Sequence, residues 1–278
     1  MKAAVLGSPI AHSLSPVLHQ AGYAALGLAD WSYTAIECAE PGLPALIASC
    51  GPGWAGLSLT MPLKRAVLPL LDTVDPVAAD TGGANTVVFD GDRRHGYNTD
   101  VAGMVAALAE AGVTTPKSAV ILGAGATACS ALAAVRDLGL GTVTVAVRDP
   151  ARAALLREVA GRLGVEVTVA PLADQGDGSL PPPDLLISTV PAGAADFLAG
   201  HYRAGVPAPA GVFDVVYAPW PTELAQAAQA AGATVVGGFE LLLHQAGGQF
   251  ELMTGHPAPL ASMRAAGRAE LDRRSATV

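Results

Sequence analysis

The sequence predicts an α/β protein of two domains, one of them built on a parallel sheet. Its 278 residues leave room for two domains of ordinary size. Hydrophobic residues make up 51% of the chain and charged residues only 14%, which excludes a disordered chain. After residue 116, short β-branched runs alternate with helical stretches. This alternation is typical of a parallel sheet covered by helices on both faces.

The first third of the chain mixes short strands and helices, with Gly or Pro at their junctions. We expect strands at 2–6 and 32–36 and a helix at 16–26. Ser15 is expected to cap this helix and Pro16 to take its first position. Two further runs, 84–89 and 94–97, predict a hairpin. A long Ala-rich helix then begins at Thr99 or Asp100 and ends near Gly112.

The rest of the chain follows a regular pattern. It predicts parallel strands at 119–122, 142–147, 165–169, 184–189 and 212–215, separated by helical stretches such as 126–138 and 151–163. A last strand at 233–236 precedes two helices, 239–253 and 258–271, that we expect to return to the first domain. The expected division is therefore 1–103 with 238–278 as one domain and 104–237 as the other, with a cleft between them.

Charge and cysteine content disfavour several classes of function. The formal net charge of -8 argues against binding to nucleic acid or to an anionic membrane surface, because both need clustered Lys and Arg. Neither a disulfide framework nor a cysteine zinc site is supported by the three widely separated cysteines, Cys38, Cys50 and Cys129. The six histidines lack metal-ligand spacing such as H-E-x-x-H, so no metal is expected.

No signal-peptide or membrane-spanning pattern stands out. The apolar run near the N-terminus is short and is interrupted at Pro9 and His12. Residues 118–135 carry no charge, but Gly123 and Gly125 break the run at its middle, which fits a strand, a turn and a helix better than a membrane span. The chain is therefore expected to be cytoplasmic.

Residues 123–128 form a G-x-G-x-x-A turn directly after a buried strand and directly before a helix. Gly123 permits the tight turn, Gly125 lets backbone amides approach a pyrophosphate, and Ala128 allows close helix–strand packing. The helix start then faces the phosphates. This context predicts a dinucleotide site in a Rossmann-like domain, in contact with Gly123, Ala124, Gly125, Ala126 and Thr127. The alternative is a purely structural turn.

The second strand of this unit ends at Arg148, where an NAD-preferring site normally has Asp or Glu. A guanidinium can pair with a 2′-phosphate, and Arg152 is one helical turn later. NADP is therefore favoured over NAD. The alternative is that both arginines lie on a solvated helix start, paired with Asp149.

Four short motifs contain residues that core packing does not need: H-S-L-S-P at 12–16, L-T-M-P-L-K at 59–64, G-A-N-T at 83–86 and Y-N-T-D at 97–100. With the turn at Gly123, the stretch 214–219 and a helix carrying Gln245, the sequence resembles the shikimate dehydrogenase family from about Ser13 to Phe250. The resemblance implies an enzyme that reversibly reduces 3-dehydroshikimate to shikimate with NADPH, in the shikimate pathway to chorismate and aromatic amino acids.

The resemblance also assigns substrate-binding residues. Ser13 and Ser15 would hydrogen-bond the substrate carboxylate, since neutral donors at a helix start can hold an anion. The remaining substrate contacts implied are Thr60, Asn85, Gln245 and, near the nicotinamide, Tyr217. Taken singly, such residues are more often caps, strand ends or exposed helix positions. Three positions are implied to lie near the cofactor: Thr189, Val190 and Gly238.

Lys64 and Asp100 match the paired catalytic residues of the family. Hydride transfer leaves a proton to be moved, so a titratable group must lie within hydrogen-bond reach of the reacting oxygen. A protonated lysine is a natural acid in the reducing direction, and the sequence leaves open which of the two accepts the proton in oxidation. Without the family, Lys64 would be interpreted as an exposed helix lysine and Asp100 as a helix cap.

Some positions depart from the usual family pattern, and alternatives stay open. Ser58 replaces an Asn, Val147 replaces the Asn before the cofactor Arg, Asp149 replaces a Thr or Ser, and Glu240 replaces a Gly. A paralogue that prefers quinate or an amino analogue and uses NAD is one alternative. Another is a regulatory module that binds nucleotide without chemistry. The oligomeric state is left open between monomer and homodimer.

Overall fold

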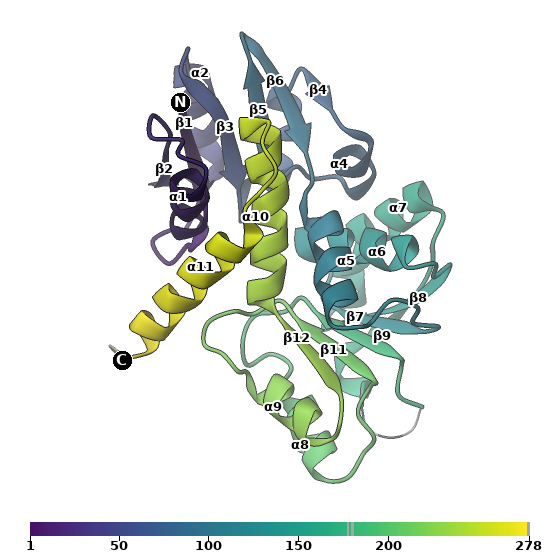
Figure 1. The fold of residues 1–278 in the computed structure, drawn as a ribbon. Coiled ribbons are helices and arrows are strands. Elements are labelled where there is room, and N and C mark those ends of the chain that lie inside the picture. The colour runs from purple at the N-terminus through teal and green to yellow at the C-terminus, as the bar shows by residue number, and fades with distance from the viewer. Residues whose placement is uncertain (177, 179–180, 277–278) are drawn as a thin grey trace. The chain divides into compact units, whose positions relative to one another are not determined.

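The structure is a computed structural model that describes residues 1–176, 178 and 181–276. The chain divides into two units, Met1–Thr99 with Leu242–Val278 and Asp100–Leu241 (Figure 1). Each contains its own six-stranded sheet. Among the described residues, no helix is both long enough and apolar enough to span a membrane.

The sheet of the first unit has the order β2-β1-β3-β5-β6-β4. β1 pairs in parallel with β2 and β3, whereas β5 runs antiparallel to β3 and β6. The hairpin expected from the sequence is confirmed, with Asp90 opposite Arg93 across the turn. The strands are β1 (Lys2–Gly7), β2 (Ser32–Glu37), β3 (Trp54–Leu59), β4 (Thr73–Val74), β5 (Thr86–Asp90) and β6 (Arg93–Tyr97).

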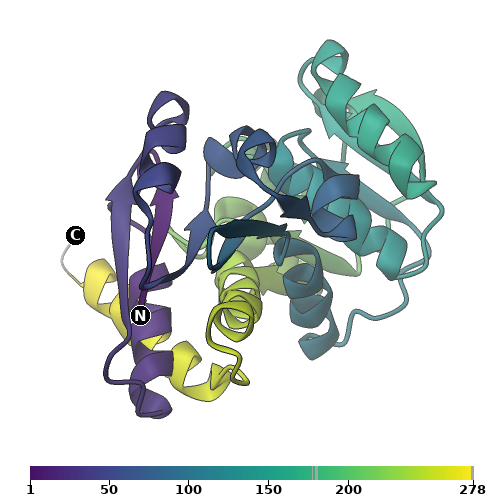
Figure 2. The same cartoon turned by 90° about the horizontal axis from the view of Figure 1, so that it is seen from above.

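The two faces of this sheet carry separate cores because side chains alternate along each strand. Ala4 and Leu6 pack with residues of α2 (Leu43–Ser49), α3 (Leu63–Ala66) and α4 (Pro76–Thr81). Ala3 and Val5 pack with α1 (Ser15–Ala25) and α10 (Gly238–Thr254). The C-terminal helix α11 (Leu260–Ser275) lies beside α1 (Figure 2). Short 3-10 turns occupy Glu40–Gly42 and Leu68–Leu70.

The start of α1 differs from the expectation. Ser15 is the first helical residue, not the cap, and Leu14 occupies the cap position without a side-chain hydrogen bond. The Ser13 hydroxyl instead accepts a hydrogen bond from the Ser15 amide at 3.3 Å. The prediction of Ser15 as the cap was therefore wrong by one residue, because Leu14 already has helical backbone angles.

The second unit is a doubly wound domain. Its sheet has the order β12-β11-β10-β7-β8-β9, and all neighbouring strands are parallel. This confirms the Rossmann-like fold, because the chain goes outward in one direction and then restarts beside β7 in the other. The strands are β7 (Ala119–Leu122), β8 (Thr142–Val147), β9 (Glu166–Pro171), β10 (Leu185–Ser188), β11 (Gly211–Asp214) and β12 (Thr234–Gly237).

Helices cover both faces of this sheet (Figure 1). α5 (Asp100–Glu110) packs against α6 (Ala126–Asp137), followed by α7 (Ala154–Leu163). On the other face, α8 (Asp196–Arg203) and α9 (Glu223–Ala230) pack with buried strand residues such as Leu186 and Val212. The predicted helix at 151–163 is a 3-10 turn, Pro150–Ala153, followed by α7, and a second 3-10 turn spans Leu172–Asp174.

Candidate functional site

The glycine-rich turn joins β7 to α6 at the point where the strand order reverses. Gly123 has a φ of 106°, and a Cβ there would lie 2.6 Å from Thr189 Oγ1. The Thr189 hydroxyl donates to the carbonyl of Leu122 at 2.7 Å. Gly123 is therefore required by both backbone angle and crowding, which confirms the tight turn. Thr189 therefore holds this turn in place, and its contact with the cofactor stays a prediction.

Gly125 is the N-cap residue of α6, and its backbone angles do not require glycine. Its φ of -80° is open to any residue, and nothing lies within 4 Å of an added Cβ. No side chain in the described part of the structure caps the helix there, so the first amides of α6 are left for another acceptor. Because neither strain nor crowding demands this glycine, the open space fits an anionic group brought against the helix start, such as a pyrophosphate. Ala128 behind it is fully buried, as close packing requires.

The arginine predicted to bind a 2′-phosphate follows the end of β8. Arg148 is exposed, and it makes no hydrogen bond or ion pair with any residue in the described ranges. Asp149 caps the following 3-10 turn by accepting from the Ala151 amide at 3.0 Å. Exposure of Arg148 is also what the alternative of a solvated helix start expects, so the 2′-phosphate contact stays a prediction. The side chain of Arg152 lies outside the described part of the structure.

Asn85 is the centre of a buried hydrogen-bond network in the first unit. It is 1% exposed, and its Oδ1 accepts from the Thr99 amide at 2.9 Å. Its Nδ2 donates to Thr99 Oγ1 at 2.9 Å and to Gln245 Oε1 at a longer 3.4 Å. The Thr99 hydroxyl donates in turn to the carbonyl of Gln245 at 3.0 Å. The structure thus brings two of the predicted substrate residues, Asn85 and Gln245, into direct contact.

Lys64 lies on the short helix α3, half-buried, and its backbone is held by the loop after α4. The Ala84 amide donates to the Lys64 carbonyl at 2.8 Å, and Gly83 packs against the same residue. Asn98 holds this loop, because its Nδ2 donates to the Gly83 carbonyl at 3.0 Å and to Thr81 Oγ1 at 2.9 Å. Asn98 belongs to the Y-N-T-D motif, but its role in holding this loop was not predicted from the sequence.

Asp100 begins α5, as expected, and is 4% exposed. It is the first residue of the second unit, whereas the division expected from the sequence put it in the first domain. Its pairing with Lys64 stays a prediction. In the first unit, Ser15 is 4% exposed, whereas Ser13 and Thr60 are half-buried.

The loop after β11 carries Tyr217, which is half-buried. Asp214 shapes this loop: its carboxylate accepts from the Thr222 hydroxyl at 2.7 Å and from the Val216 amide at 3.3 Å. Burial raises the pKa of Asp214, and these hydrogen bonds act in the other direction. The role of Asp214 was not predicted, although the sequence pointed to the stretch it begins.

Gly238 has a packing reason for being glycine. A Cβ there would lie 2.0 Å from the carbonyl oxygen of Val215, and the Gly238 amide donates to the Val216 carbonyl. Its implied place near the cofactor stays a prediction. Val190 lies against Gly123 at the glycine turn, with its Cγ1 3.4 Å from an added Cβ.

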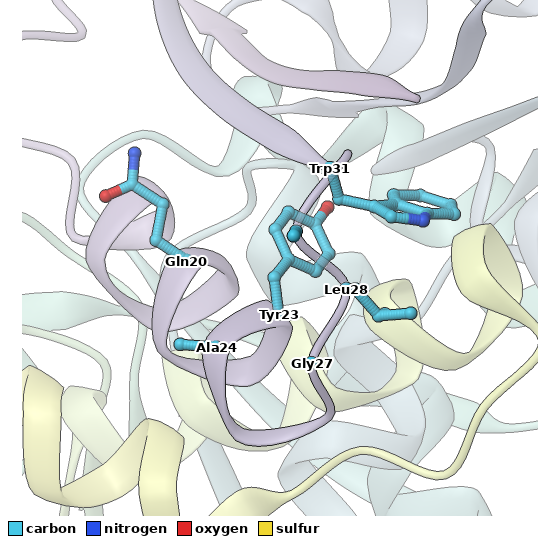
Figure 3. A pocket seen from close by; sticks show the side chains of 7 residues that line it. Gln20, Tyr23, Ala24, Gly27, Leu28 and Trp31 are labelled. Atoms are coloured by element: carbon cyan, nitrogen blue, oxygen red, sulfur yellow. The ribbon is translucent and has the colours of Figure 1, made fainter.

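Two pockets of the described residues contain none of the predicted site residues. One of about 330 Å³ lies between α1 and the following loop, walled by Tyr23 and Trp31 (Figure 3). The other, of about 620 Å³, lies in the second unit and is lined in part by Val120, Thr144 and Thr168. Neither coincides with the glycine turn or the Asn85 network.

Comparisons with known proteins agree with this arrangement. The family profile described as the shikimate dehydrogenase substrate binding domain matches residues 5–87, and the shikimate 5′-dehydrogenase C-terminal domain matches 238–266. A protein of Citrifermentans bemidjiense named shikimate dehydrogenase (NADP(+)) is 39% identical over 97% of this chain and 95% of its own.

Solved structures agree over the same length. Shikimate dehydrogenase of Mycobacterium tuberculosis is 40% identical, with a TM-score of 0.86 over 96% of this chain and 99% of that one. The Thermus thermophilus enzyme, solved in complex with NADP(H) and shikimate, is 32% identical, with a TM-score of 0.83 over 97% of this chain and 99% of that one. With identity above 30% along nearly its whole length, this chain belongs to the shikimate dehydrogenase family.

Proposed function

We propose that the chain is an NADP-dependent shikimate dehydrogenase that reversibly reduces 3-dehydroshikimate to shikimate. The observation that carries the proposal is the full-length match to proteins named shikimate dehydrogenase (NADP(+)). Residues 1–103 with 238–278 would bind the substrate, and 104–237 would bind NADP. The geometry of the separate units supports each half of this assignment.

The glycine turn supports the cofactor half. Open space at Gly125 and an uncapped α6 fit a pyrophosphate, and the exposed Arg148 has a guanidinium available for a 2′-phosphate. NADP, when bound, would supply or accept the hydride through its nicotinamide ring. In contact with it we place the turn from Gly123 to Thr127, together with Arg148, Arg152, Thr189, Val190 and Gly238. NAD is the less favoured cofactor, because no carboxylate stands at position 148.

The Asn85 network supports the substrate half. The Asn85 carboxamide is engaged mostly by Thr99, and its bond to Gln245 is the long one at 3.4 Å. A substrate hydroxyl can replace this weak contact and hydrogen-bond both amides. Ser13 and Ser15 would hold the carboxylate at the start of α1, and Thr60 and Tyr217 would complete the contacts.

Lys64 and Asp100 are the proposed catalytic residues. The Lys64 ammonium would donate a proton to the ketone oxygen as the hydride adds to its carbon. In the reverse direction the pair would take the hydroxyl proton. Anchoring of the Lys64 backbone by Ala84 supports this, because a proton donor must be held in one position to act in the transition state.

Turnover by the purified chain tests the proposal, with shikimate or quinate supplied against NADP or NAD and the reduced cofactor followed. We expect shikimate with NADP to be the fastest combination. A preference for quinate with NAD would support the paralogue instead, and no turnover in any combination would support the regulatory module.

A matched pair of variants tests the proposed proton donor. Lys64→Ala should lower kcat by about 10²- to 10⁴-fold, the usual contribution of a general acid. Lys117→Ala, which removes an exposed lysine of the second unit, should leave kcat unchanged. Equal activity of the two variants would remove Lys64 from the mechanism.

As part of the same proposal, the enzyme would act in the cytoplasm as a monomer or homodimer, without a nucleic-acid partner. The three free cysteines support a reducing compartment, because extracellular proteins usually pair theirs.

A further inference from the structure

Tyr33 is the start of a buried polar chain that the sequence did not indicate. It lies on β2, is 0% exposed, and its hydroxyl donates to Ser58 Oγ at 2.6 Å. Burial raises the pKa of Tyr33, and the hydrogen bond with Ser58 acts against this effect. The Tyr33 hydroxyl therefore links β2 to Ser58 on β3.

From Ser58 the chain continues toward the Asn85 network. The Ser58 hydroxyl donates to Gln249 Oε1 at 2.8 Å, and Gln249 Nε2 donates to the Asn85 carbonyl at 3.1 Å. Ser58 and Gln249 are 3% and 1% exposed, so water does not compete for these bonds. Tyr33 donates to Ser58, Ser58 donates to Gln249, and Gln249 donates to the Asn85 carbonyl. The three hydrogen bonds therefore all run in the same direction, from Tyr33 to Asn85.

We propose that Tyr33 is a positioning residue of the substrate site, acting through Ser58 and Gln249 on the backbone of Asn85. The proposal rests on the proposed function, in which the Asn85 side chain binds a substrate hydroxyl. Tyr33 orients Ser58, Ser58 orients Gln249, and Gln249 holds the Asn85 carbonyl, so this hydrogen-bonded series fixes where the Asn85 carboxamide meets the substrate. Its own hydroxyl is buried and contacts protein groups.

Tyr23 shows that packing alone does not require such a hydroxyl. Tyr23 and Tyr33 belong to the same buried cluster beside Phe250, and both are at most 3% exposed. Yet the Tyr23 hydroxyl has no hydrogen-bond partner among the described residues. The two tyrosines thus share ring burial and differ in what the hydroxyl contacts, which makes Tyr23 a matched control.

The experiment compares Tyr33→Phe with Tyr23→Phe and the unmodified chain. We expect Tyr33→Phe to raise the KM for shikimate about ten-fold, as the loss of one buried hydrogen bond predicts, with a much smaller effect on kcat and on the KM for NADP. Tyr23→Phe should leave all three constants unchanged. The proposal is overturned if Tyr33→Phe leaves the KM for shikimate unchanged, or if it raises the KM for shikimate and the KM for NADP equally.

Ser58 supplies a second, independent test. If the hydrogen bonds from Tyr33 to Asn85 act together, Ser58→Ala should also raise the shikimate KM, whereas Ser58→Thr, which keeps the hydroxyl, should leave it near that of the unmodified protein. The double variant Tyr33→Phe with Ser58→Ala should raise the shikimate KM no more than the more damaging single change. Additive effects in the double variant would show that the two hydroxyls act separately and would contradict the proposal. If Tyr33→Phe does not fold, the Ser58 pair decides the question.

Turnover of shikimate by the unmodified chain separates the two proposals. If that chain is inactive, the proposed function fails and Tyr33 has no substrate site to position. If it is active while the Tyr33 and Ser58 variants match it, only the positioning role fails.

Discussion

Replacing His19 with phenylalanine should remove part of the acid sensitivity of the fold. His19 is 0% exposed and stacks on Tyr33 with ring centroids 4.0 Å apart. Neither ring nitrogen has a partner with hydrogen-bond geometry among the described residues. Burial lowers the pKa of His19 to about 3, and a contact with Gln249 offsets this only in part. Phenylalanine keeps the stacked ring and has no group to titrate.

The direction of the effect follows from proton binding. In the unfolded chain the imidazole titrates near its model value of 6.5, whereas in the folded chain it stays neutral down to about pH 3. Between these values the unfolded state binds more protons, so the free energy of unfolding falls as the pH falls. The pH of 4.5 lies two units below the pKa of His19 in the unfolded chain. At about 1.36 kcal/mol per unit, the free energy of unfolding is therefore lower by about 3 kcal/mol than at neutral pH.

Urea unfolding at pH 7.5 and pH 4.5 measures this difference. The free energy of unfolding should fall by about 3 kcal/mol less in His19→Phe than in the unmodified chain. His256→Phe, at an exposed histidine, is the control and should keep the full acid dependence. If His19→Phe loses as much stability on acidification as the unmodified chain, His19 is not buried as a neutral base.

Three further predictions concern single positions. Gly238→Ala should destabilise the second unit by about 3 kcal/mol in urea unfolding, since its Cβ would lie 2.0 Å from the Val215 carbonyl; an unchanged midpoint would contradict the packing. Asn98→Ala should lower kcat about ten-fold by releasing the loop that holds Lys64, with a smaller effect on the KM for NADP; equal effects on both constants would indicate general loosening. Arg148→Ala should weaken NADP binding about ten- to hundred-fold while sparing NAD, as titrations with both cofactors would reveal; equal losses would exclude a 2′-phosphate contact.

Local sequence patterns were sufficient for much of the second unit. The strands Ala119–Leu122 and Thr142–Val147 have the predicted bounds, and Gly123 adopts the left-handed φ that a tight turn needs. These features depend on neighbours within a few residues, which periodicity and glycine placement report directly. Ser15 shows the limit of local reasoning. Serine often occupies the cap position, yet here the helix begins one residue earlier than this preference predicts, and Ser15 is its first residue.

The sequence by itself determined the family, the doubly wound unit and the residue types that suit an anionic cofactor and a hydroxylated acid. Only the tertiary structure decided that Tyr33, Ser58 and Gln249 form one hydrogen-bond chain ending at Asn85. It also decided that Gly238 is required by packing against Val215. A hydrogen bond needs its partners within about 3 Å, and residues 58 and 249 reach that distance only after the sheet and α10 have come together.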